Sequence, residues 1–259
     1  MAQLGLSRGG MDIHKPKPLH GWRTFLAEVG TIVLGVVIAL GAEQAVDALH
    51  WQGKVAEARE AMRLELRDDD VLQAYTRAAS AGCYAKPLDA IQAAVEAGAD
   101  RRAIMALAQA YRPPLRTWDT EAWAAVLSSD VASHVSARQM TRWSGPYRLI
   151  PALRAVNQEE QENLVQLRAG RRTPGRLSEN EADRILLAVE ALRQDDRQMS
   201  VGSLYLLVAA ADAGIETPES QKRQILAALR AKLGACVAAP STKGLDLNAQ
   251  VTTPRAPGG

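Results

Sequence analysis

The strongest pattern in the chain is an apolar segment that begins at Trp22 and ends near Leu49. Its centre, residues 29–42, contains no charged side chain, and Glu28 lies directly before it. A helix needs about 20 mostly apolar residues to cross the hydrocarbon core of a bilayer, so residues 22–42 meet that length only with Glu28 included. The pattern therefore predicts one transmembrane helix over residues 22–49.

The uncharged stretch is also short enough to be the core of a cleavable signal peptide, and residues 39–41 offer small side chains at cleavage positions. We favour an uncleaved anchor for two reasons. Trp22 and Trp51 bracket the segment, and a helix between them would be about 43 Å long, close to a bilayer with its interfacial zones. The helical pattern also continues without a break into residues 54–66.

The orientation follows from the length of the flanking segments, because lysine and arginine are equally frequent on the two sides of the span. A short N-terminal tail obeys the positive-inside rule, whereas a long downstream domain is translocated largely regardless of charge. We therefore expect a single-pass protein with a cytoplasmic N-terminus. In a bacterium the domain after residue 50 would lie in the periplasm and the span in the inner membrane.

Small side chains recur every four residues within the span and form one stripe, which would let another helix approach closely. That helix would be a second copy of the span or the span of a partner. The alternative is that the stripe has no role in association, because glycine and alanine are common in membrane helices in general. The stripe consists of Ala27, Thr31, Gly35 and Ala39.

Glu28 is the acidic residue within residues 22–42, the most apolar part of the predicted span, where a carboxylate is costly without a partner or access to water. Its position less than two turns from Trp22 allows the side chain to reach the membrane interface. We favour anchoring at the interface, or pairing with Arg23 or a partner helix, over a role in proton transfer.

Beyond the span, apolar residues recur at helical spacing and no strand pattern appears. The capping box Ser178-Glu-Asn-Glu181 is the clearest local signal, and it predicts the start of a long helix. Pro146 and Pro151 predict interruptions of the helix that Ser136 begins. Helices are expected over residues 51–79, 88–97 and 100–112, followed by a short helix that Thr120 caps. The helix from Ser136 is expected to be interrupted at residues 145–146 and 151, with a further helix from there to about residue 169. The last two helices are expected over residues 178–212 and 218–234.

These elements predict an all-α protein, in which one N-terminal transmembrane helix continues as a stalk into an extramembrane helical bundle. The domain boundaries follow from the same pattern. We expect a flexible tail over residues 1–21, the span over 22–49, the helical domain over 50–237 and a disordered tail over 238–259.

Composition and charge fit an ordinary folded domain, with 47% hydrophobic residues, 23% charged residues and a net charge of +2. The near-neutral charge leaves no basic footprint for nucleic acid, so none is expected as a partner. Cys83 and Cys236 form an even pair, which would form a disulfide in an oxidising compartment; the alternative is two unlinked buried thiols. Neither cysteine has a second ligand at the spacing of a metal site.

Candidate chemistry is sparse. The acidic runs 68–70, 159–162 and 195–196 are predicted to be solvated helix faces, because consecutive acids on a helix point in different directions. The histidines stand alone and no catalytic motif appears, so we expect no catalytic residue and no cofactor. Arginines at 168, 171, 172 and 176 would bind a phosphate or lipid headgroup, or complement a helix C-terminus. Four aromatic residues lie in one region and would anchor the core or line a pocket: Trp118, Trp123, Trp143 and Tyr147.

Residues 27–40, Ala-Glu-Val-Gly-Thr-Ile-Val-Leu-Gly-Val-Val-Ile-Ala-Leu, resemble the N-terminal span of a family of uncharacterised bacterial membrane proteins. Members of that family carry a Glu, then a Val/Ile/Leu run with a Gly, then Ile-Ala-Leu. The resemblance covers residues 23–63. It implies a single-span anchor with a helical domain and assigns no activity; Glu28 would match the family's Glu and Gly35 its Gly.

The sequence leads to two functional hypotheses. The first is a non-enzymatic module, anchored in the bilayer, that binds a partner protein and self-associates through its span. The second is a sensor or transport-accessory domain that binds a small ligand among the tryptophan-rich helices and signals through the stalk. A cavity near Trp123 and Tyr147 would favour the second, and a solid core with an exposed apolar patch would favour the first.

Overall fold

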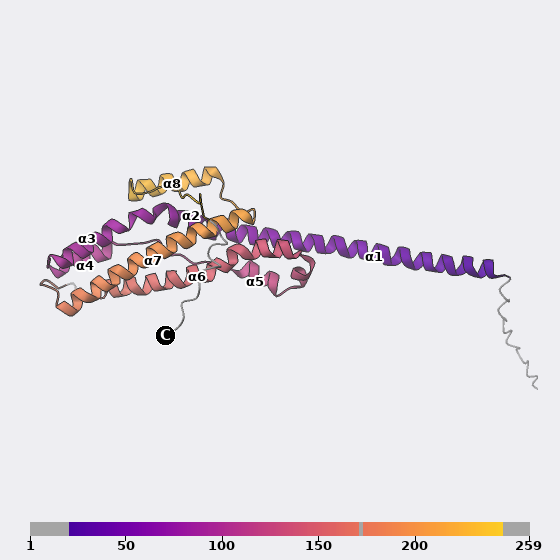
Figure 1. Ribbon diagram of the computed structural model, residues 1–259, viewed down its shortest axis with the longest axis horizontal. Helices are drawn as coiled ribbons and strands as arrows, with labels where there is room; N and C mark the ends of the chain where they lie inside the picture. The colour runs from indigo at the N-terminus through magenta and orange to yellow at the C-terminus, as the bar shows by residue number, and fades with distance from the viewer. Residues whose placement is uncertain (1–20, 171–172, 246–259) are drawn as a thin grey trace, which may run out of the picture. The chain divides into compact units, whose positions relative to one another are not determined.

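The computed structural model describes residues 21–170 and 173–245, and within those ranges the chain forms helices and loops without a strand. A long apolar N-terminal helix leads into a helical bundle, as the sequence predicted (Figure 1). The chain divides into two compact units, residues 1–52 and residues 53–259. The predicted N-terminal tail, except Gly21, and residues 246–259 of the predicted C-terminal tail lie outside the described residues.

The first unit consists of the N-terminal part of helix α1, which begins at Trp22 and ends at Glu65. All side chains from 21 to 50 are exposed. Within the described ranges, this is the one helix long and apolar enough to cross a membrane, and no residue of its most apolar window of 18 residues is buried. The hydroxyl of Thr31 donates to the carbonyl oxygen of Ala27 at 2.9 Å, so this polar side chain is satisfied within its own helix.

In the second unit the chain stays helical from α1 through a π-helical turn, Leu66–Asp70, into α2, Val71–Ser80. The sequence predicted this continuity as far as Ala79. A short 3-10 turn, Ala81–Cys83, then separates α2 from the next helix. The remaining elements are α3 (Ala85–Glu96), α4 (Arg101–Ala110), α5 (Glu121–Leu127), a 3-10 turn (Asp130–His134), α6 (Ala137–Arg168), α7 (Glu179–Asp212) and α8 (Glu219–Leu233).

Side-chain caps explain where three of these helices begin. Asp100, Ser136 and Ser178 each accept a hydrogen bond from a backbone N–H in the first turn of the helix that follows. Glu181 also accepts from the backbone N–H of Ser178, which completes the predicted capping box. Thr120 stands at the N-cap of α5 without a capping bond, and its hydroxyl accepts from Arg154.

The predicted interruption of the helix after Ser136 is wrong, because α6 continues as one helix through Pro146 and Pro151. A proline inside a helix removes a backbone hydrogen bond and costs about 3 kcal/mol or more. The buried residues Tyr147 and Leu153 flank these prolines, and α6 packs more extensively on α7 than any other pair of helices does. Tertiary packing therefore outweighs the local cost.

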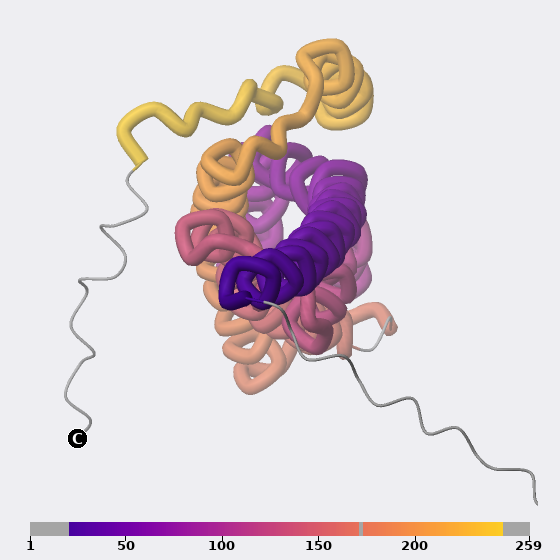
Figure 2. Tube along the Cα trace, turned by 90° about the vertical axis from the view of Figure 1, so that its right-hand side faces the viewer, coloured from indigo at the N-terminus to yellow at the C-terminus, as the bar shows by residue number. Residues whose placement is uncertain are grey.

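Helix α7 lies at the centre of the bundle, between α2 and α3 on one side and α6 on the other (Figure 1). Leucine, isoleucine, valine and alanine side chains from α3, α4, α6 and α7 form a core, with Tyr84 and Tyr111 packed edge to face at 6.0 Å. Helix α8 packs on α2 at the outside of the bundle (Figure 2). None of the side chains of α8 is buried.

Cys83 and Cys236 lie at disulfide distance, with their sulfur atoms 2.08 Å apart. The bond ties the segment after α8 to the end of α2. Next to it, the backbone N–H of Ala238 donates to the carbonyl oxygen of Ala79 at 3.1 Å, and the side chain of Val237 is buried. The C-terminal segment is thus held covalently, by a hydrogen bond and by apolar burial.

Candidate functional site

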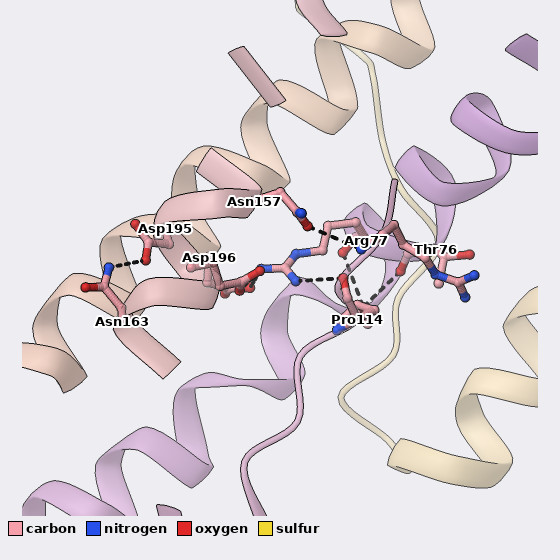
Figure 3. Close-up of polar contacts among 10 residues, drawn as sticks. Thr76, Arg77, Pro114, Asn157, Asn163, Asp195 and Asp196 are labelled. Carbon is pink, nitrogen blue, oxygen red and sulfur yellow. Dashed lines mark hydrogen bonds and ion pairs between the residues drawn. The ribbon is translucent and has the colours of Figure 1, made fainter. Parts of the chain in front are cut away.

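The centre of the helical bundle holds an ionic cluster around Arg77 of α2. One nitrogen of the guanidinium, Nη2, donates to the carboxylates of Glu160 at 2.5 Å and Asp196 at 3.2 Å, and Nη1 donates to the carbonyl oxygen of Pro114 at 3.4 Å (Figure 3). The side chains of Arg77 and Glu160 are 3% and 0% exposed. Arg77 therefore joins α2, α6, α7 and the loop after α4 at one point.

The cluster holds more negative than positive charge, because two carboxylates share one guanidinium. Burial raises the pKa of Asp196 to about 6 and also raises the pKa of Glu160, while Arg77 opposes both shifts. The guanidinium carbon of Arg77 also lies 5.6 Å from the centre of the Tyr84 ring, which adds a cation–π contact. Because the cluster is buried, its side chains fix the positions of the helices that carry them. A ligand from solvent has no access to these side chains.

Polar side chains on either side of the cluster also form hydrogen bonds within the bundle. The amide nitrogen of Asn163 donates to Asp195 at 2.7 Å, and the amide oxygen of Asn157 accepts from the backbone N–H of Arg116 at 3.2 Å (Figure 3). The prediction that the acidic runs at 159–162 and 195–196 are solvated is therefore wrong for Glu160, Asp195 and Asp196.

A second group of buried acids lies where α1 passes into the π-helical turn. Asp70 is fully buried, and its Oδ1 accepts from the backbone N–H of Asp119 at 3.2 Å. Burial raises the pKa of Asp70 to about 7. Glu65 accepts from the backbone N–H of Ala122 at 2.8 Å and from the hydroxyl of Tyr147 at 2.9 Å. The prediction of a solvated acidic run at 68–70 therefore fails at Asp70.

The aromatic region forms part of the core. Trp118, Trp143 and Tyr147 are buried, and Trp123 stacks on Tyr147 with ring centres 5.4 Å apart and planes 11° apart. The cavity lined by Trp143 and Tyr147 measures about 20 Å³. A cavity of that size holds about one water molecule, so Trp143 and Tyr147 anchor the core and this cavity has no space for a ligand.

An open groove of about 470 Å³ runs between α6 and α7. Apolar side chains from both helices line it, together with polar side chains of α7. Val201, an apolar residue of α7, is 47% exposed there. The residues of this α6–α7 groove are Leu149, Ala152, Leu153, Val156, Gln194, Arg197, Gln198, Val201, Gly202 and Tyr205.

The predicted residues of the span all lie exposed on α1. Ala27, Thr31, Gly35 and Ala39 recur at helical spacing, and a Cβ atom added at Gly35 would meet nothing within 4 Å. Glu28 forms no ion pair within the described residues. The two predicted interface aromatics have polar neighbours: the guanidinium of Arg23 lies 5.7 Å from the ring centre of Trp22, and the ring of His50 lies 5.6 Å from that of Trp51.

Of the arginines predicted as one basic loop, Arg168 has described backbone partners. Arg168 donates to the carbonyl oxygens of Ala108 and Tyr111, so it complements the end of α4. Residues 171 and 172 lie outside the described part. The structure thus supports the helix-terminus interpretation for Arg168.

Within the described residues, no group of three or more His, Cys, Asp or Glu side chains is placed to hold a metal ion. No family model matches the chain, and neither the curated proteins nor the solved structures contain a match to it. The functional argument therefore rests on the geometry of this chain alone.

Proposed function

We propose that this protein is a single-pass bacterial membrane protein whose helical domain binds a partner protein without catalysing a reaction. In this proposal α1 anchors the chain in the inner membrane, with the N-terminus in the cytoplasm and the bundle in the periplasm. Two features support it: the exposed apolar helix, and the cysteine pair at disulfide distance, which is compatible with an oxidising compartment.

The α6–α7 groove is the observation that carries the binding proposal. Two adjacent helices with apolar side chains at helical spacing form the kind of groove that accepts the apolar face of an amphipathic helix. Leu149, Leu153 and Val156 provide one wall, and Val201 and Tyr205 provide the other. Gln194, Gln198 and Arg197 would supply hydrogen bonds at the rim, as interfaces between proteins usually require.

The span offers a second place for association. Its stripe of small residues, from Ala27 to Ala39, would let a second copy or a partner's span pack closely, and Glu28 would lie at the inner interface or meet a partner there. The ligand-sensing alternative has less support, because the cavity beside Tyr147 holds about one water molecule.

Site-specific photo-crosslinking in intact cell membranes tests the groove. A photoreactive amino acid placed at Val201 or Val156 should yield one discrete adduct, whereas placement at Leu187 of α7 or Val165 of α6 should yield none. These controls are apolar positions outside the groove and are more exposed than Val201, at 70% and 69% against 47%. An adduct with the mass of a dimer would identify the partner as a second copy. The absence of an adduct at both groove positions, or equal adducts at all four, would contradict the proposal.

A further inference from the structure

A basic pocket of about 270 Å³ opens beside the first turns of α6. Three arginines contribute to its lining, and no acidic residue does. This arginine pocket lies wholly within the second unit. Its lining residues are Arg59, Ser136, Arg138, Gln139, Arg142, Trp143 and Ala213.

The three arginines of the pocket form no ion pair within the described residues. Other arginines of α1 and of the bundle do form ion pairs. Arg63 pairs with Glu60 on the same helix, and Arg193 pairs with Asp89 and Glu190. Three like charges that share one concave surface repel one another. A bound anion would remove that repulsion and satisfy their donors.

The position of two of these arginines is unfavourable for the helix itself. Arg138 and Arg142 lie in the first two turns of α6, a helix of 32 residues whose first turn contains no acid. The positive end of the helix dipole disfavours cations there and favours anions. By contrast, the first turn of α7 carries Glu179 and Glu181. Arginines at this end of α6 therefore cost stability, which indicates a use other than folding.

The opposite wall of the pocket is the C-terminal end of α7. Ala213 is the C-cap of α7, where free carbonyl oxygens would attract guanidinium groups. Two oxygens of the last turn are already bonded: the backbone N–H of Gly214 donates to Ala211 at 2.9 Å, and that of Ile215 donates to Ala210 at 2.8 Å. These two bonds reduce the number of acceptors that the end of α7 offers to the arginines.

From these observations we infer that Arg59, Arg138 and Arg142 form a binding site for a phosphoryl group, completed by the N-terminal turn of α6. Guanidinium groups bind phosphate oxygens in pairs, and a helix N-terminus adds backbone donors. The pocket is large enough for a phosphate ester as well as for the free ion. A lipid headgroup and a soluble phosphate compound present this same chemistry.

Arginine-specific labelling of the full chain in lipid nanodiscs tests the inference. Phenylglyoxal would be applied to protein in phosphatidylcholine discs with and without inorganic phosphate, and in discs that contain phosphatidylglycerol without phosphate. Mass spectrometry then reads the labelling rate at each arginine. We expect slower labelling at Arg59, Arg138 and Arg142 in at least one arm, with unchanged rates at the exposed Arg102 and Arg223.

Substitutions make the test quantitative. Arg138→Gln should weaken binding of the protecting anion about tenfold, because it removes one charge-assisted contact. Arg138→Lys keeps the positive charge and should lose less affinity for the anion than Arg138→Gln does. The matched control, Arg102→Gln with Arg223→Gln, removes two charges elsewhere and should bind as the native protein does. Arg138 is exposed, so its variants should keep the helical circular dichroism spectrum of the native protein.

The arms of the experiment also distinguish the source of the ligand. Protection by phosphatidylglycerol alone would identify a lipid headgroup, and protection by inorganic phosphate would identify a soluble ligand; either result supports the site. Absence of protection in both arms would overturn it. Equal protection at Arg102 and Arg223, which would indicate general screening, would overturn it as well.

Discussion

Arg77 of α2 and Glu160 of α6, 83 positions apart in the sequence, form an ion pair in the core of the helical domain, with 2.5 Å between nitrogen and oxygen. Both side chains are almost completely removed from solvent. A buried pair contributes little net stability compared with apolar residues, but the loss of one partner leaves an uncompensated buried charge. The pair therefore specifies how α2 and α6 pack, and each partner depends on the other.

Replacement of the central cation should be strongly destabilising. Arg77→Met leaves Glu160 and Asp196 without their shared partner, and we expect the free energy of unfolding to fall by about 3–5 kcal/mol. Urea unfolding followed by circular dichroism measures this. Lys222→Gln, which breaks an exposed pair with Glu219, is the control and should cost at most about 1 kcal/mol. Equal, small effects of the two substitutions would show that the buried pair is dispensable.

The stability of the domain should fall as the pH rises from about 4 to about 7. Burial raises the pKa of Asp70 from 3.8 in the unfolded chain to about 7, so the folded state holds this proton more tightly. The stabilisation is complete below pH 4 and is lost as the pH rises through 7, on the order of 4 kcal/mol in all. Asp196 acts in the same direction up to about pH 6.

Asp70→Asn tests this assignment, because it removes the titrating group and keeps the oxygen that accepts from Asp119. The free energy of unfolding, measured by urea at pH 4, 5.5 and 7.5, should vary less with pH than in the native protein. Asp69 is one residue away and exposed, so Asp69→Asn retains Asp70. The free energy of unfolding of this variant should vary with pH as it does in the native protein. A native slope in the Asp70 variant would refute the assignment.

Reduction of the cysteine pair should lower the melting temperature. The bond links residues 153 positions apart, and the chain-entropy model gives about 5 kcal/mol for a loop of this length. Cys83→Ser should have the same effect, and a reductant should then change nothing further. Hydrogen exchange at the amide of Ala238 should accelerate in parallel, since its bond to Ala79 lies beside the disulfide. Unchanged melting and exchange after reduction would mean that the link carries no stability.

Loss of the α7 cap should have a smaller, local effect. Ser178→Ala removes the acceptor for the backbone N–H of Glu181 and should cost about 1 kcal/mol of stability. Ser220→Ala, on the exposed side of α8, is the control, and there alanine favours the helix slightly. The prediction fails if chemical unfolding gives both variants the same stability.

Local signals in the sequence predicted most of the fold. The capping box at Ser178 gave the start of α7, and the apolar run after Trp22 gave α1. The interruption predicted at Pro146 and Pro151 was wrong, because the sequence shows only the local cost of a proline in a helix. The packing against α7 that overcomes this cost comes from a distant part of the chain. Cys83 and Cys236 were predicted as a pair because the chain offers no other cysteine.

The ionic cluster was missed for a different reason. Glu160 was grouped with its acidic neighbours in sequence, although it lies in the buried stripe of α6 with Leu153, Asn157 and Leu164. That spacing of three and four residues was a usable signal. Its partner Arg77 was not predictable, because only the folded bundle brings α2 against α6. The arginine pocket was missed likewise, since Arg59 is far from Arg138 in the chain.

The membrane topology is the property on which the proposed function depends most directly. Reporters fused before the span and after residue 240, combined with gels run with and without reductant, measure topology and cysteine state together. We predict a cytoplasmic N-terminus, a periplasmic C-terminus and a mobility shift on reduction that Cys83→Ser abolishes. A cytoplasmic C-terminus with free thiols would contradict the orientation, the disulfide and the proposed periplasmic partner.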